Sequence, residues 1–181
     1  MHLSEKGRSQ ADAAAERIAA LRRPPVAVYA SPLERAMETA RPIASRLGLR
    51  VISERGLVEC DYGSWTGKQL RELRRLREWR TVQQLPSAFK FPGGESFVEM
   101  QARVTATIDR LSEKHHGRSF VAVSHADAIK AVIAATAAVP LDLFQRLVVS
   151  PCSITAVIRD RAGHRVLCVN STADLSEIAV S

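Results

Sequence analysis

Four segments of the chain have apolar residues at intervals of three and four, the spacing of one face of an α-helix. In the first segment Ser4 can cap the helix, and Pro24 follows its end. The second segment contains Pro42, which is expected to kink or divide it. The predicted helices cover residues 4–23, 32–48, 95–117 and 126–138.

Short apolar runs typical of buried strands lie between these helices. They are VAVYA at 26–30, VIS at 51–53 and FVAVS at 120–124, and the last is expected to be fully buried. Two alternating runs, at 153–160 and 164–170, predict a hairpin that can add a mixed edge to the sheet. Strands that alternate with helices indicate an α/β domain with a mostly parallel sheet.

The segment from Glu54 to Gly94 is mostly irregular, but it contains a strongly basic stretch that predicts one helix over residues 68–80. Clustered cations can indicate nucleic-acid binding. Acidic residues interrupt this run, and no series of aromatic residues accompanies it, so we expect a solvated helix with one packing side and no nucleic-acid partner. The cations are Lys68, Arg71, Arg74, Arg75, Arg77 and Arg80, the acids Glu72 and Glu78, and the packing side Leu70, Leu73, Leu76 and Trp79.

Length and composition indicate one domain over residues 1–181, because the chain has 181 residues and 46% hydrophobic residues. The net charge is +7, and 21 of the 26 cationic residues are arginine, which grips phosphate and carboxylate with a planar fork. An anionic ligand is therefore expected.

The three cysteines are widely spaced and suggest neither a disulfide framework nor a zinc knuckle. The sequence offers no clustered metal ligands, so no metal is expected. No segment approaches the roughly 18 apolar residues of a membrane span, and the first ten residues lack the apolar core of a signal peptide. We therefore expect a soluble, cytoplasmic protein with no membrane partner.

Polar residues follow three of the predicted strands, at the edge where open α/β sheets bind ligands. Arg35 follows the first strand, Glu59 lies in the loop after the second, and His125 follows the third. Taken singly, Arg35 could be a surface residue, Glu59 a solvated loop acid, and His125 a packed histidine. Together they could bind a phosphate and transfer protons.

Five sequence blocks follow one another along the chain. They are LSEKGRSQA (3–11), SPLERAMETA (31–40), LVECDYGSWTG (57–67), FPGGES (91–96) and VSHADAIKAV (123–132). In order and spacing they resemble the histidine phosphatase superfamily, also called phosphoglycerate mutase-like proteins. The resemblance covers nearly the whole chain, and the combination of blocks is more specific than any one of them. It implies a three-layer α/β/α sandwich and phosphoryl transfer through a phosphohistidine.

The resemblance also implies a role for individual residues. Arg35 would bind the phosphate, and His125 would be a second pocket histidine that contacts the phosphoryl oxygens. Glu59 would donate a proton to the leaving group. A loop that borders the pocket in relatives would contribute the possible lining residues Gly93, Glu95 and Ser96. No cofactor is implied.

The family's nucleophile lies in an Arg-His-Gly motif at the end of a first strand, and none of the five histidines here follows an arginine. We therefore expect that this chain is an N-terminally incomplete version of the domain, inactive as given. Because the family's first strand lies inside the sheet, its loss would leave unpaired edges on both neighbouring strands.

Three functions stay open on the sequence. The preferred one is hydrolysis of small phosphate monoesters, and the second is a phosphomutase of the phosphoglycerate mutase type. The third is a pseudoenzyme that binds phosphorylated ligands through Arg35 and His125 without turnover. Neither the substrate nor the oligomeric state follows from the sequence, and a homodimer is possible.

Overall fold

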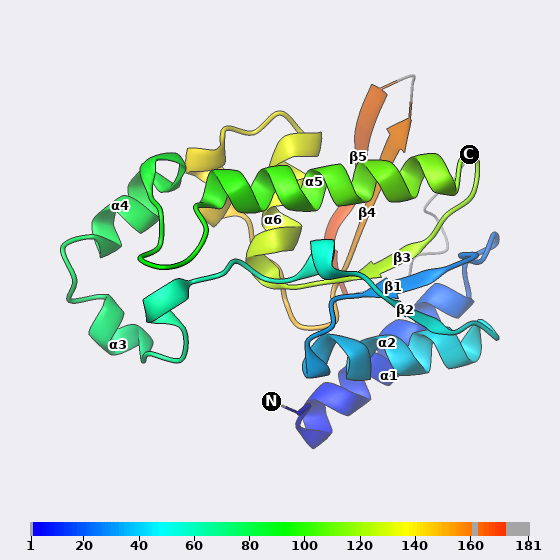
Figure 1. The fold of residues 1–181 in the computed structure, drawn as a ribbon. Helices are drawn as coiled ribbons and strands as arrows, with labels where there is room; N and C mark the ends of the chain where they lie inside the picture. The colour runs from blue at the N-terminus through cyan, green and yellow to red at the C-terminus, as the bar shows by residue number, and fades with distance from the viewer. Residues whose placement is uncertain (1, 161–162, 173–181) are drawn as a thin grey trace.

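The computed structural model of the protein describes residues 2–160 and 163–172. Its main helices form two layers with strands between them (Figure 1). One layer holds α1 and α2, and the other holds α5 and α6. The predicted α/β sandwich is confirmed by this arrangement. The helices are α1 (Glu5–Ala19), α2 (Glu34–Arg46), α3 (Leu70–Leu73), α4 (Trp79–Gln84), α5 (Phe97–Lys114) and α6 (Ala126–Thr136), with 3-10 turns at Arg55–Leu57, Gly63–Trp65, Pro86–Ala88 and Leu141–Arg146.

The central sheet is parallel, as the alternation of strands and helices predicted. Its strands β1 (Val28–Ala30), β2 (Val51–Ser53) and β3 (Val121–Val123) follow the order β2-β1-β3. Val28 of β1 lies opposite Val51 of β2 and Val121 of β3, so the carboxyl ends of all three strands meet at one edge.

The predicted hairpin is present as β4 (Ile154–Asp160) and β5 (Gly163–Ser171), which pair antiparallel. The predicted turn includes residues 161–162, which lie outside the described residues. Within the described residues the hairpin forms its own two-stranded sheet, so the expected mixed edge on the parallel sheet is wrong. The two sheets stay separate because a large cavity lies between β3 and β4, and residues of both strands line it.

Local sequence signals account for the start of two long helices, α1 and α5. Ser4 caps α1 by accepting a hydrogen bond from the Gly7 N–H. Pro42 lies inside α2 but does not divide it, contrary to one of the expected outcomes. Ser96 and Glu99 form a reciprocal capping box at the start of α5. The apolar face predicted for α5 is buried and comprises Phe97, Met100, Val104, Ile108 and Leu111.

The single basic helix expected over residues 68–80 is wrong. The structure divides this stretch into α3 and α4, joined by tight turns. Arginines three and four residues apart in a continuous helix would repel one another, which disfavours that helix. Of the expected packing side, Leu73 is buried, whereas Leu70 and Leu76 are exposed. Trp79 stacks against Trp65, with ring centroids 6.5 Å apart.

The burial of β3 also differs from expectation. All three of its residues are only half-buried, whereas the sequence predicted a fully buried strand. The residues of β1 beside it are buried throughout. Among the described residues no helix is both long and apolar enough to cross a membrane.

Candidate functional site

Arg35 and His125 meet at the carboxyl edge of the parallel sheet. Arg35 lies in the first turn of α2, which follows β1, and His125 is the N-cap residue of α6, which follows β3. An Arg35 Nη2 lies 3.0 Å from His125 Nδ1. On the other side of the imidazole, His125 Nε2 lies 2.8 Å from the Ser31 Oγ. The sequence therefore placed both residues at the correct edge.

These contacts fix the protonation of His125. A guanidinium can only donate, so Nδ1 accepts from Arg35 and the ring proton resides on Nε2, which donates to Ser31. Burial and the nearby Arg35 and Arg103 lower the pKa of His125 to about 4. His125 is thus a neutral imidazole at physiological pH, and both of its nitrogens already have partners within the protein.

Glu59 comes from the loop after β2, and its carboxylate points to the N-terminus of α6. It accepts hydrogen bonds from the backbone N–H groups of Cys60 at 3.0 Å, Ala128 at 3.2 Å and Asp127 at 3.4 Å. Burial is the largest cause of a raised pKa of Glu59, and the charge of Asp127 adds to it. A carboxyl group with a raised pKa keeps its proton to a higher pH than an ordinary glutamate does. It is therefore suited to act as a general acid.

Asp127 connects Glu59 to two further polar side chains. Its carboxylate accepts a hydrogen bond from the Tyr62 hydroxyl at 3.0 Å and pairs with Lys130 at 3.2 Å. The resulting network holds the loop of Tyr62 against the first turn of α6. It therefore fixes both the position of Glu59 and the charge beside it.

Arg103 of α5 anchors the Glu59 loop from the opposite side. Its guanidinium donates to the carbonyls of Gly56 at 2.9 Å, Val58 at 3.0 Å and Glu59 at 3.3 Å. It also pairs with Glu95, and Glu95 in turn accepts from the Asp61 N–H. Sequence reasoning missed Arg103, because an arginine beside the apolar stripe of a helix gives no signal that it binds a distant loop.

The three remaining lining residues predicted for the pocket lie in two different places. Gly93 and Glu95 border a second cavity of about 380 Å³, which Glu59 and Arg103 also line. Ser96 instead caps α5. Gly93 has φ +74°, a conformation that favours glycine.

Arg35, Glu59 and His125 all line one larger cavity of about 760 Å³. This cavity continues from the site along the length of β3 and β4. The sheet edge, the Glu59 loop and the start of α6 therefore converge at one end of it. A guanidinium, a neutral imidazole and a carboxyl group of raised pKa are groups that can bind a phosphoryl group and protonate its leaving oxygen.

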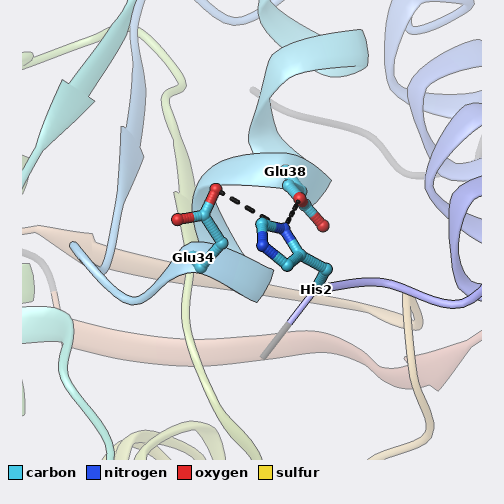
Figure 2. A group of neighbouring side chains, drawn as sticks. All are labelled: His2, Glu34 and Glu38. Carbon is cyan, nitrogen blue, oxygen red and sulfur yellow. Dashed lines mark hydrogen bonds and ion pairs between the residues drawn. The ribbon is translucent and has the colours of Figure 1, made fainter.

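A second polar group lies at the start of the chain, near α2. Figure 2 shows His2 beside Glu34 and Glu38, with His2 Nδ1 at 2.6 Å from Glu38 and 3.9 Å from Glu34. The hydrogen bond from His2 is the largest cause of the lowered pKa of Glu38. The sequence suggested no clustered metal ligands, but the fold brings these three together, because residue 2 lies beside the first turn of α2.

The chain is similar to known proteins over most of its length. Residues 1–172 match the family described as histidine phosphatase superfamily (branch 1). Phosphoserine phosphatase 1 of Hydrogenobacter thermophilus is 29% identical, over 98% of this chain and 84% of its own length. An uncharacterized protein of Mycobacterium tuberculosis is 39% identical over 68% of this chain, and the match spans 60% of that protein.

The fold is likewise shared with solved structures. A mycobacterial glucosyl-3-phosphoglycerate phosphatase in complex with inorganic phosphate aligns with a TM-score of 0.83 and 30% identity, over 97% of this chain and 90% of its own. Because this alignment covers nearly all of the chain, the two proteins share the overall fold.

Proposed function

The chain belongs to the histidine phosphatase superfamily, and we propose that its site serves the hydrolysis of small phosphate monoesters through a phosphohistidine. The observation that carries the proposal is the contact between Arg35 and His125 beside Glu59, at one end of a single cavity. The relatives named phosphoserine phosphatase and glucosyl-3-phosphoglycerate phosphatase support a phosphatase over a mutase.

In this proposal the described residues bind the phosphoryl group and handle protons. Arg35 donates to the phosphoryl oxygens, and the Nε2–H of His125 turns from Ser31 to donate to them as well. Backbone N–H groups at the start of α6 add positive potential. Together they neutralise the charge that gathers on the equatorial oxygens during transfer.

The reaction then follows two balanced steps. A nucleophilic histidine nitrogen, which the described residues beside Arg35 do not supply, attacks phosphorus. The bond to the ester oxygen breaks, and that oxygen leaves as an alcohol with a proton from Glu59. Water next attacks the phosphohistidine and transfers a proton to the Glu59 carboxylate, which releases phosphate and restores both groups. His125 does not act as the nucleophile, because its Nδ1 accepts from Arg35 and its Nε2 carries the ring proton, so neither nitrogen has a free lone pair.

Phosphate binding without turnover is the second candidate function. It is favoured by the surroundings of His125, because among the described residues no second histidine lies beside it on the cavity wall near Arg35. His115 and His116 also line the cavity, but they follow α5, at the end where β3 begins.

The first test is binding of orthophosphate and of vanadate, measured by calorimetry and by the thermal midpoint of unfolding. Both anions are expected to bind, and Arg35→Gln is expected to weaken binding by about tenfold or more, since a charge-assisted contact to phosphate is lost. Arg41→Gln is the matched control, because Arg41 lies on the same helix and is exposed. Its affinity should equal that of the unaltered protein.

The second test is turnover of p-nitrophenyl phosphate and phosphoserine. The phosphatase is supported if the unaltered protein releases phosphate. It also requires that Glu59→Gln loses turnover but still binds phosphate. Binding without turnover in every form of the protein supports the second candidate. If Arg35→Gln binds phosphate as well as Arg41→Gln does, the site assignment is wrong.

A further inference from the structure

More than half of the net charge of the chain lies in residues 68–85, which we name the α3–α4 segment. Its six cations and two acids give +4, against +7 for the whole chain. All six cations are exposed, and none of them forms an ion pair among the described residues. The fold therefore leaves this charge available to a partner. The cations are Lys68, Arg71, Arg74, Arg75, Arg77 and Arg80.

Three leucines of the same segment are exposed to solvent. Leu70 is 59% exposed, Leu76 39% and Leu85 48%. Eight large apolar side chains are exposed among the described residues, so more than a third of them lie in this one segment. A single exposed apolar residue is common on a protein surface, but a group of them among cations indicates an interaction site.

Other side chains of the segment fix which of its sides faces the protein. Leu73 and Val82 are buried, and Trp79 stacks against the buried Trp65. Figure 1 shows α3 and α4 at one end of the molecule. Since the inward side is taken by these packed residues, the exposed cations and leucines lie on the outward side. The segment therefore presents positive charge and apolar surface together.

The combination of cations with leucines distinguishes between two kinds of anionic partner. Nucleic acid attracts cations through its phosphates, and single strands stack their bases on exposed aromatic rings. The one aromatic residue of the segment, Trp79, is half-buried and already stacks on Trp65. A bilayer with anionic lipids instead accepts cations at its headgroups and leucines at the boundary with the acyl chains. The exposed side chains therefore favour the bilayer.

We propose that the α3–α4 segment binds the surface of anionic lipid bilayers, with its cations at the headgroups and its three exposed leucines at the acyl boundary. The sequence-based expectation of no membrane partner considered spanning segments, and a segment that lies on a bilayer surface needs none. The proposal does not depend on the proposed function, because no residue of the segment lines the cavity of Arg35, Glu59 and His125.

The test is binding of the full chain to lipid vesicles, measured by sedimentation. One preparation contains phosphatidylcholine and phosphatidylglycerol in equal parts, and the other contains phosphatidylcholine alone. The protein is expected to bind the anionic vesicles at least about tenfold more tightly, because phosphatidylcholine has no net charge to attract the cations. High salt should weaken the binding, since it screens the charges.

A pair of double variants tests the contribution of the charge. Arg74→Glu with Arg75→Glu is expected to weaken binding to the anionic vesicles by about tenfold or more, because two attractive charges become repulsive. Arg22→Glu with Arg23→Glu is the matched control, since these arginines are also adjacent and exposed but lie outside the segment. It makes the same change in net charge and should weaken binding far less.

A second pair of variants tests the leucines. Leu70→Ser with Leu76→Ser is expected to weaken vesicle binding by about tenfold, because apolar contact with the acyl boundary is lost. Val98→Ser with Val148→Ser removes two exposed apolar side chains elsewhere and should leave vesicle binding unchanged. The thermal midpoint of unfolding reports whether each variant is folded.

Four outcomes would overturn the proposal. The first is absence of binding to the anionic vesicles, and the second is equal binding to both vesicle preparations. The third is an equal loss in the Arg22 and Arg23 control, since the net charge and not the segment would then be responsible. The fourth is binding of polyuridylate RNA that is tighter than vesicle binding, with the leucine substitutions affecting neither, because the segment would then bind nucleic acid instead.

Discussion

Strands β1 and β3 have similar apolar sequences but different surroundings. In β1, Val28 and Ala30 are 0% exposed, and the strand pairs on both sides. In β3, Val121 and Val123 are only half-buried, and among the described residues the strand pairs on one side. The difference shows that an apolar run specifies the ability to be buried, while the neighbouring elements decide whether burial is reached.

The two strands also supply opposite halves of the site. The end of β1 contributes Ser31 and, one turn later, Arg35, whereas the end of β3 contributes His125. The fully packed strand thus holds the charged group, and the half-packed strand holds the neutral one. His125, which follows β3, is held by its contacts with Arg35 and Ser31.

The largest expected effect is the pH dependence caused by His125, at the end of β3. Its pKa is lowered to about 4, so the unfolded chain binds more protons between about pH 6.5 and pH 4. The contribution of His125 to the free energy of unfolding is fully present above that window and is lost as the pH falls through it. The complete shift corresponds to roughly 3 kcal/mol, since one pKa unit is about 1.4 kcal/mol.

Urea unfolding at pH 7 and pH 4.5 measures this loss. The free energy of unfolding should differ less between the two pH values in His125→Gln than in the unaltered protein, because the imidazole that titrates in this window is gone. The exposed His164→Gln serves as the control and should keep the full difference. An unchanged pH dependence in His125→Gln would show that the imidazole is not held neutral by burial.

The next effect tests the two strands directly. Val28→Ala removes two buried methyl groups and should cost about 2 kcal/mol in the free energy of unfolding. Val123→Ala should cost about half as much, because its side chain is only half-buried. Urea denaturation measures both. Equal costs in the two strands would remove the contrast.

The smallest effect concerns two serines on either side of β3. Ser31→Ala removes the acceptor of the His125 Nε2–H and should cost about 1 kcal/mol. Ser153→Ala should be close to neutral, because the Ser153 Oγ has no partner among the described residues to lose. Thermal unfolding of both variants makes the comparison, and a larger cost for Ser153→Ala would contradict it.

Much of the fold could be predicted because its signals are local. The cap at Ser4, the apolar face of α5 and the alternating runs of the hairpin each act within a few residues. The division of the basic stretch into α3 and α4 was missed, because the apolar spacing of Leu70 and Leu76 imitates a buried helix face although both are exposed. A periodic pattern cannot show whether a surface exists for that face to pack against.

The sequence by itself determined the α/β class and the placement of Arg35, Glu59 and His125 at the ends of strands, since parallel strands align their carboxyl ends. Only the tertiary structure decided the contacts that make them a site. These include the neutral form of His125 between Arg35 and Ser31, and the anchoring of the Glu59 loop by Arg103. The physical reason is that burial, charge and hydrogen-bond partners come from residues tens of positions apart, and folding alone brings those residues together.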